Sequence, residues 1–254
     1  MLWWQNLLLS LIEGITEYLP VSSTGHLMMA NYLLGIDPKQ TDTYIIGIQF
    51  GAILSVVVLY PKKFFNFSDL KFYYKLLVAF IPAAILGLLF DDYLEELLHE
   101  PAIVGIMLIV IGIVLLFIDK WLPGGDGTVD NLSYKSAFII GFSQCFAMIP
   151  GVSRSASAII GGLYCKLKKT EATEFSFFLA VPTLCAAAGY KLLKDYDTLD
   201  LGQLQDIAIG NVISFVVAIF AIKFFINIVK KYSFRVFGIY RIIVGAIFLS
   251  ILFF

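Results

Sequence analysis

The chain has 254 residues, of which 59% are hydrophobic and only 15% are charged, with a formal net charge of −1. Its mean hydropathy is +0.87, whereas a soluble domain is about half apolar and about a quarter charged. The charge excludes nucleic acid as an expected partner. The apolar residues come in long runs, which are typical of helices that cross a lipid bilayer in about 17–25 residues. The composition therefore predicts an all-α polytopic membrane protein.

Two of the predicted apolar segments are interrupted by proline, and six are continuous. The first broken segment runs over 2–19, Pro20 and 24–34, and three whole segments follow at 44–60, 73–90 and 102–118. After a glycine-rich loop, the second broken segment covers 136–149, Pro150-Gly151 and 155–167, and whole segments follow at 175–193, 207–226 and 236–254. Broken backbone at membrane depth is tolerated where it is buried in protein or lines a cavity. We therefore expect six transmembrane helices and two re-entrant helical hairpins.

The order of one broken and three whole segments occurs twice, over 1–122 and 132–254, within one membrane domain. An offset of 131 residues aligns Glu13 with Gln144 and Ser22 with Ser153. Three spans in each half place the halves in opposite orientations. The pattern predicts an inverted-topology repeat, which is common in membrane folds.

The basic residues test this topology. The loops that six spans place on one side, at 61–75, 119–135, 166–170 and 223–235, carry thirteen Lys and Arg residues. The other side carries only Lys39, Lys191 and Lys194. Because basic loops remain in the cytoplasm, both termini are predicted to face outward, in the periplasm.

The first break reads "EGITEYLPVSSTGH", from Glu13 to His26, and it begins with two carboxylates four residues apart. Glu13 and Glu17 would share one helix face, and carboxylates at membrane depth are costly unless something compensates their charge. Hard oxygen ligands suit Mg²⁺ or Ca²⁺, so these two residues are the candidate metal ligands. The alternative places both carboxylates at the aqueous surface.

The remaining polar residues of the first break are Ser22, Ser23, Thr24, Gly25 and His26. One hydroxyl suffices to cap a helix, and three exceed what a cap needs. The N-terminus of a helix binds anions, and a glycine lets a ligand or a second backbone approach closely. The histidine, beside hydroxyls and carboxylates, is a candidate general acid or base.

The second break reads "AMIPGVSRSASAIIGG" and contains Arg154 between Ser153 and Ser155. An arginine within a membrane segment indicates a functional site, and a guanidinium fork beside hydroxyls suits a phosphate group. The two breaks together predict a pocket for a phosphorylated ligand with a lipid tail. Arg241, also flanked by apolar residues, is interpreted as the partner of a carboxylate or as an interfacial residue, with substrate contact as a further alternative.

These residues resemble the signatures of a known family. "EGITEYLPVSSTGH" and "PGVSRSAS" are similar to the two motifs of the undecaprenyl-pyrophosphate phosphatases of the bacitracin-resistance type, and "EATEFSFFLAVP" resembles the stretch that follows them. The second motif departs at Ala156, where the family has glycine. The resemblance implies a bacterial inner-membrane enzyme, dependent on a divalent cation, with its site open to the periplasm. It implies hydrolysis of undecaprenyl pyrophosphate to the monophosphate and phosphate, which recycles the lipid carrier for peptidoglycan.

The resemblance assigns catalytic roles to Glu17, Ser23, His26 and Arg154. The binding residues expected beside them are Glu13, Ser22, Thr24, Gly25, Ser153 and Ser155. Ser23 as the nucleophile and a water activated by His26 or Glu17 both remain open. A polyprenyl-phosphate flippase using the same pocket is the alternative function, and a homodimer is a further expectation.

Overall fold

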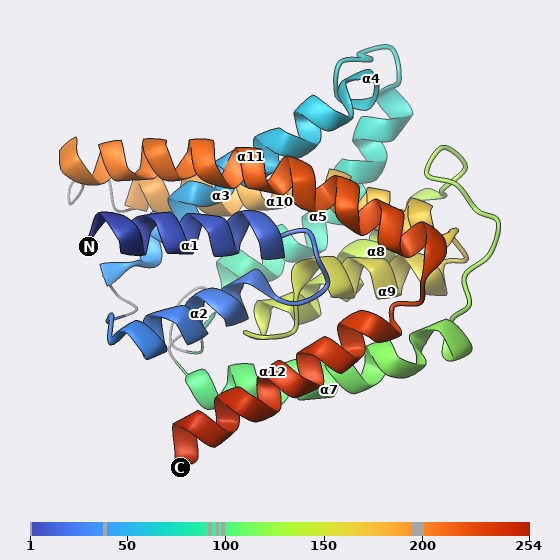
Figure 1. Cartoon of the computed structure of the whole chain (residues 1–254). Helices are drawn as coiled ribbons and strands as arrows, with labels where there is room; N and C mark the ends of the chain where they lie inside the picture. The colour runs from blue at the N-terminus through green and yellow to red at the C-terminus, as the bar shows by residue number, and fades with distance from the viewer. Residues whose placement is uncertain (1, 38–39, 91–92, 95–96, 98–99, 195–200) are drawn as a thin grey trace.

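The computed structural model describes residues 2–37, 40–90, 93–94, 97, 100–194 and 201–254 (Figure 1). Over these residues the regular structure is helical, and one isolated bridge joins Gly127 to Leu167. The helices of the first half are α1 (Trp3–Thr16), α2 (Ser23–Leu34), α3 (Asp42–Leu59), α4 (Pro61–Phe64), α5 (Leu70–Leu89) and α7 (Pro101–Trp121). Those of the second half are α8 (Tyr134–Gln144), η2 (Cys145–Met148), α9 (Arg154–Tyr164), α10 (Lys169–Lys194), α11 (Leu201–Lys231) and α12 (Arg235–Phe253).

Six of the described helices are long and apolar enough to cross a membrane, namely α3, α5, α7, α10, α11 and α12. They coincide with the six predicted whole segments and confirm the prediction of a polytopic all-α membrane protein. Two of them extend well past their apolar runs. The helix predicted over 175–193 begins at Lys169, and that predicted over 207–226 runs from Leu201 to Lys231, because polar residues continue a helix into the membrane interface.

The two broken segments form two pairs of short helices. α1 ends at Thr16, one turn earlier than Pro20 predicts, and α2 begins at Ser23; residues 17–22 are called the first turn. α8 ends at Gln144 and continues through η2 to α9, so residues 145–153 are called the second turn. In Figure 1, α1 runs inward from the end that carries the N-terminus, and α2 returns toward that end.

The long helices enclose these two pairs. α1 packs against α11, and α8 packs against α5. α7 and α12 pack with their backbones close together, since a Cβ on Gly238 would lie 2.6 Å from the carbonyl oxygen of Gly112. Likewise a Cβ on Gly245 would lie 2.9 Å from the oxygen of Gly105. Small residues permit such close approach of helices in membranes.

The largest apolar core surrounds the two turns. It includes Tyr18 and Val21 of the first turn, Ile159 of α9 and Phe177 of α10. Both chain termini lie at one end of the bundle, and α4 and the 122–133 loop lie at the other (Figure 1). The core therefore holds both turns in the interior, between two ends of the molecule that differ in charge.

Two ion pairs join neighbouring segments at the basic end of the bundle. Lys63 pairs with Asp130, and Lys169 pairs with Asp119. These lysines belong to the predicted cytoplasmic set. Of the three predicted outward lysines, Lys39 lies outside the described residues.

Candidate active site

An ion pair joins the two turns. Arg154, the first residue of α9, donates from Nε and Nη2 to Oε1 of Glu17 over 3.2 and 3.1 Å. The Arg154 side chain is 10% exposed and that of Glu17 is 4% exposed, so the pair lies almost wholly inside the protein. Nη1 of Arg154 donates to the Ser176 carbonyl oxygen over 2.8 Å. The structure thus brings together a carboxylate and a guanidinium that are 137 positions apart.

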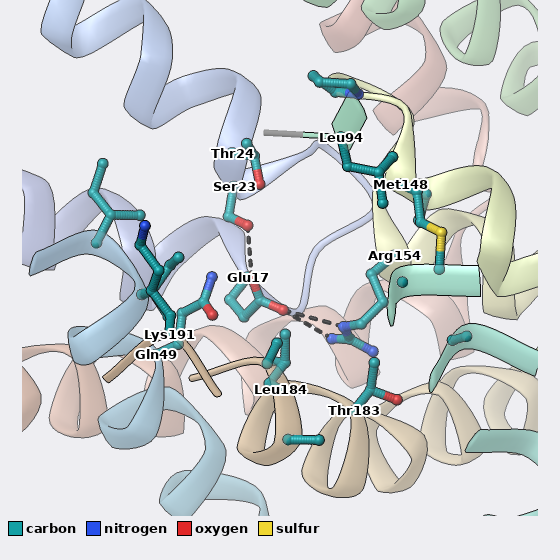
Figure 2. Close-up of a pocket in the computed structure, with 18 of the residues that line it drawn as sticks. Glu17, Ser23, Thr24, Gln49, Leu94, Met148, Arg154, Thr183, Leu184 and Lys191 are labelled. Carbon is teal, nitrogen blue, oxygen red and sulfur yellow. Dashed lines mark hydrogen bonds and ion pairs between the residues drawn. The ribbon is translucent and has the colours of Figure 1, made fainter. Parts of the chain in front are cut away.

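Glu17 also accepts a hydrogen bond from Ser23. The Ser23 hydroxyl donates to Oε2 of Glu17 over 2.6 Å, so each oxygen of this carboxylate has a different partner. Figure 2 shows Glu17 between Ser23 and Arg154, which come from opposite turns. A carboxylate in this position can accept the proton of the hydroxyl, and the guanidinium can bind an anion beside it.

Each turn ends in a serine that caps the helix after it. The Ser22 hydroxyl accepts from the Gly25 amide over 3.2 Å, and the Ser153 hydroxyl accepts from the Ala156 amide over 3.3 Å. Both serines have left-handed backbones, with φ of 74° and 82°. Such backbone in a residue other than glycine costs on the order of 1–3 kcal/mol and is concentrated at functional sites. The two caps place the N-termini of α2 and α9 directly after the two turns.

Six of the predicted site residues line one cavity of about 520 Å³. They are Glu17, Ser22, Ser23, Thr24, Ser153 and Arg154. The cavity continues from this polar end along α5 and α10, where its walls are largely apolar. The other four predicted residues, Glu13, Gly25, His26 and Ser155, do not line it.

Gly25 and Ser155 lie behind the cavity wall. The Ser155 hydroxyl donates to the Leu19 carbonyl oxygen over 2.8 Å, which ties α9 to the first turn. A Cβ on Gly25 would meet Val104 and the Ser22 hydroxyl, each at 3.2 Å. The close approach expected at this glycine is therefore made by the protein itself.

His26 points away from the Ser23 hydroxyl. Its Nδ1 lies 2.7 Å from the Ser22 carbonyl oxygen, and its Nε2 lies 2.7 Å from the Tyr240 hydroxyl. The two rings are stacked, with centroids 5.6 Å apart. In this arrangement Glu17, and not His26, is the group that contacts Ser23.

Glu13 is fully buried and lies one helical turn before Glu17. Both of its carboxylate oxygens lack a hydrogen-bond partner among the described residues. Such an acid must carry a proton or take up a cation. No group of three or more His, Cys, Asp or Glu side chains within the described part of the chain is arranged to hold a metal ion. The predicted metal ligands Glu13 and Glu17 lie one helical turn apart, and Asp42 is a further carboxylate that lines the cavity.

The family model described as bacitracin resistance protein BacA matches residues 6–247. The chain belongs to this family. It is 50% identical to an undecaprenyl-diphosphatase of Flavobacterium johnsoniae, over 98% of this chain and 96% of the relative. It is 47% identical to that of Bdellovibrio bacteriovorus, over 97% and 95%, and 39% identical to that of Enterococcus faecalis, over 96% and 94%.

This member of the BacA family has further polar residues in the cavity that motif reasoning missed. They are Asn31, Asp42, Gln49, Gln144, Thr183, Tyr190, Lys191 and Lys194. Gln144 was within reach of the sequence, because the repeat aligns it with Glu13. The sequence analysis used the two lysines only to assign the sides of the membrane. The sequence at a helix end does not show whether that end lies beside a cavity or at the membrane surface.

Proposed function

We propose that this chain hydrolyses undecaprenyl diphosphate to undecaprenyl phosphate and inorganic phosphate, and so recycles the lipid carrier for peptidoglycan and other cell-wall polymers. The observation that carries the proposal is the position of Glu17, which contacts both Ser23 and Arg154 at the polar end of an apolar cavity. The full-length similarity to undecaprenyl-diphosphatases supports the same activity. Because the similar proteins bear the name of a hydrolase, the flippase alternative has no support.

The cavity suits a substrate with a charged head and a long apolar tail. The head meets Arg154 and the amides at the starts of α2 and α9, which together offer a fork of donors and two positive dipole ends. The tail meets the apolar wall, built from Leu27, Ile45, Ile46, Phe80, Leu88, Leu94 and Leu184 among others. Lys191 and Lys194 line the same cavity and add positive charge for an anionic headgroup.

The contacts support a displacement at the terminal phosphorus. The Ser23 oxygen attacks that phosphorus, Glu17 takes the hydroxyl proton, and the bond to the bridging oxygen breaks to release the lipid monophosphate. Water then attacks the phosphorus of the phosphoserine, and the bond from phosphorus to the Ser23 oxygen breaks. The proton held by Glu17 returns to the Ser23 oxygen, and inorganic phosphate leaves. Arg154 stabilises the charge on the transferring phosphoryl group. Direct attack by water activated by Glu17 or His26 remains the alternative, and both routes need the same anion contacts.

A divalent cation, Mg²⁺ or Ca²⁺, fits beside Glu13. The supporting observation is its buried carboxylate, whose two oxygens have no donor among the described residues, and carboxylate oxygens are the preferred ligands of these ions. Glu17 would be the second ligand once it gives up its contact with Arg154. When bound, the ion would offset negative charge on the diphosphate.

We also propose that the two broken segments are re-entrant hairpins of an inverted repeat. The return of α2 toward the end where α1 began supports this arrangement (Figure 1). So do the reciprocal contacts of Gly112 with Gly238 and of Gly105 with Gly245. The site would face the periplasm of a bacterial inner membrane, on the side of both termini. A homodimer stays a prediction.

The orientation is tested with single cysteines in a variant that lacks the three native ones. A cysteine at Lys191 should react with a membrane-impermeant maleimide added to spheroplasts that retain an intact inner membrane. A cysteine at Lys231, at the basic end, should react only after the membrane is opened. The reverse pattern would contradict a periplasmic site.

The activity is tested on purified protein in detergent with undecaprenyl diphosphate and Mg²⁺. The protein should release phosphate, and Arg154→Lys should lower kcat/KM by about 10²-fold, because an ammonium keeps the charge but loses the two-donor fork. Arg235→Lys, at an exposed arginine, is the matched control and should leave the rate unchanged. If Arg154→Lys releases phosphate with the same kcat/KM as the parent, the proposed active site is wrong.

The base is tested by comparing two isosteric changes. Glu17→Gln should lower kcat by about 10³-fold, within the usual range for loss of a general base, because it removes the acceptor of the Ser23 proton. His26→Gln should cost about 10-fold, since the imidazole is bound to Ser22 and Tyr240 outside the cavity. A larger loss in His26→Gln than in Glu17→Gln would assign the proton transfer to His26. Acid-quenched turnover of substrate labelled in the terminal phosphate should leave label on the protein, and Ser23→Ala should abolish it; absence of label in the parent favours the water route.

The cation site is tested by thermal unfolding without substrate. Saturating Mg²⁺ should raise the unfolding midpoint of the parent by about 5 °C or more, the shift expected for a site at 100 times its dissociation constant. Glu13→Gln should lose this shift, and in a chelator it should unfold at about the same temperature as the parent, because without a cation the buried Glu13 carboxyl is already protonated and neutral. Glu100→Gln, at an exposed position, controls for loss of a carboxylate. An unchanged Mg²⁺ shift in Glu13→Gln would rule out this ligand.

A further inference from the structure

Arg241 of α12 is fully buried, and its recorded hydrogen bonds all go to backbone carbonyl oxygens. The expectation of a carboxylate partner is therefore wrong. The side chain has no exposed surface. Arg241 does not line the cavity either, which excludes the third reading, contact with substrate. Its three guanidinium nitrogens instead donate to five backbone carbonyl oxygens, and this set of bonds is called the bracket.

The bracket spans the two turns. Nη1 of Arg241 donates to the Pro20 carbonyl oxygen over 3.0 Å, in the first turn. Nη2 donates to the carbonyl oxygens of Gly151 and Val152, in the second turn. The remaining bonds, over 3.4 Å, reach Met107 and Leu108 of α7. One planar guanidinium thus joins both turns to the α7–α12 pair.

The bonded carbonyls lie directly before the strained residues of the site. Pro20 precedes Ser22 by two positions, and Val152 immediately precedes Ser153. These two serines have the positive φ values that a side chain disfavours, so something must hold the backbone in place. A guanidinium has the fixed, fork-shaped donor set that can fix several acceptors at once, whereas an ammonium is a point charge on a flexible stem.

We propose that Arg241 is a positioning residue: it sets the distance between the two turns and so aligns Ser23 and Glu17 of one half with Arg154 of the other. Its consequence for turnover rests on the proposed function. The hydrogen bond from Ser155 to Leu19 is a second tie, which joins the first turn to α9, the helix that directly follows the second turn. The bonds of Arg241 and the bond of Ser155 act together, because either one alone still partly fixes the position of one turn relative to the other.

The first test measures the turns themselves and needs no activity. Amide hydrogen exchange is followed in the parent, in Arg241→Lys and in the control Arg235→Lys. Arg241→Lys should speed exchange at least tenfold in peptides covering 17–26 and 149–157, and leave 207–226 unchanged. Unchanged exchange in the turns, or faster exchange spread evenly over all helices, would overturn the proposal. If the parent releases no phosphate, the proposed function fails while this readout still decides the role of Arg241.

The second test measures turnover. Arg241→Lys should lower kcat by about 10²-fold, the loss expected when reacting groups shift by about 1 Å, while KM stays within threefold because Arg154 still binds the headgroup. In combination with Ser155→Ala, the loss should exceed the product of the two single losses at least fivefold. The proposal is wrong if the loss of kcat in the double variant equals the product of the two single losses, or if Arg241→Lys leaves kcat unchanged. Either result would show that the two turns are aligned without this arginine.

Discussion

The buried contact between Glu17 and Arg154 is the constraint on which the rest of the structure depends. Removing one partner of a buried pair leaves an uncompensated charge, at a cost of about 3–5 kcal/mol, and both charges here lie among membrane helices. The pair can form only if the first and second turns meet in the interior. The long helices therefore have to be arranged around the turns, and the core that includes Tyr18 and Phe177 fills the space beside them.

Much of this could be predicted from the sequence, because its signals are local or periodic. Apolar runs locate the six spans, and proline together with a cluster of hydroxyls locates each break. The unequal distribution of lysines and the predicted repeat indicate that the two broken segments enter from opposite sides. They therefore predict that Glu17 and Arg154 meet, although the sequence shows no contact between them. The boundaries are less certain, since α1 ends at Thr16 and the chain before Pro20 is already a turn.

The directions of side chains could not be predicted in the same way. A motif places His26 three residues after Ser23, but its partner Tyr240 comes from the other end of the chain. Gly25 serves packing against Val104, which no spacing reveals. Arg241 looks like half of an ion pair because carboxylates are the usual partners of buried guanidinium groups, and its actual partners are carbonyl oxygens. Every residue has a backbone carbonyl oxygen, so the sequence does not show which of them a buried arginine will contact.

The same contacts indicate how substrate would change the site. Glu17 neutralises Arg154, and its second oxygen accepts from Ser23. A diphosphate competes with Glu17 for the guanidinium, which frees one carboxylate oxygen beside the buried Glu13. The freed carboxylate oxygen and the diphosphate would then repel each other in the low-dielectric interior. A divalent cation held by Glu13 and Glu17, as proposed above, would offset that repulsion and would leave Glu17 in contact with the hydroxyl whose proton has to be taken.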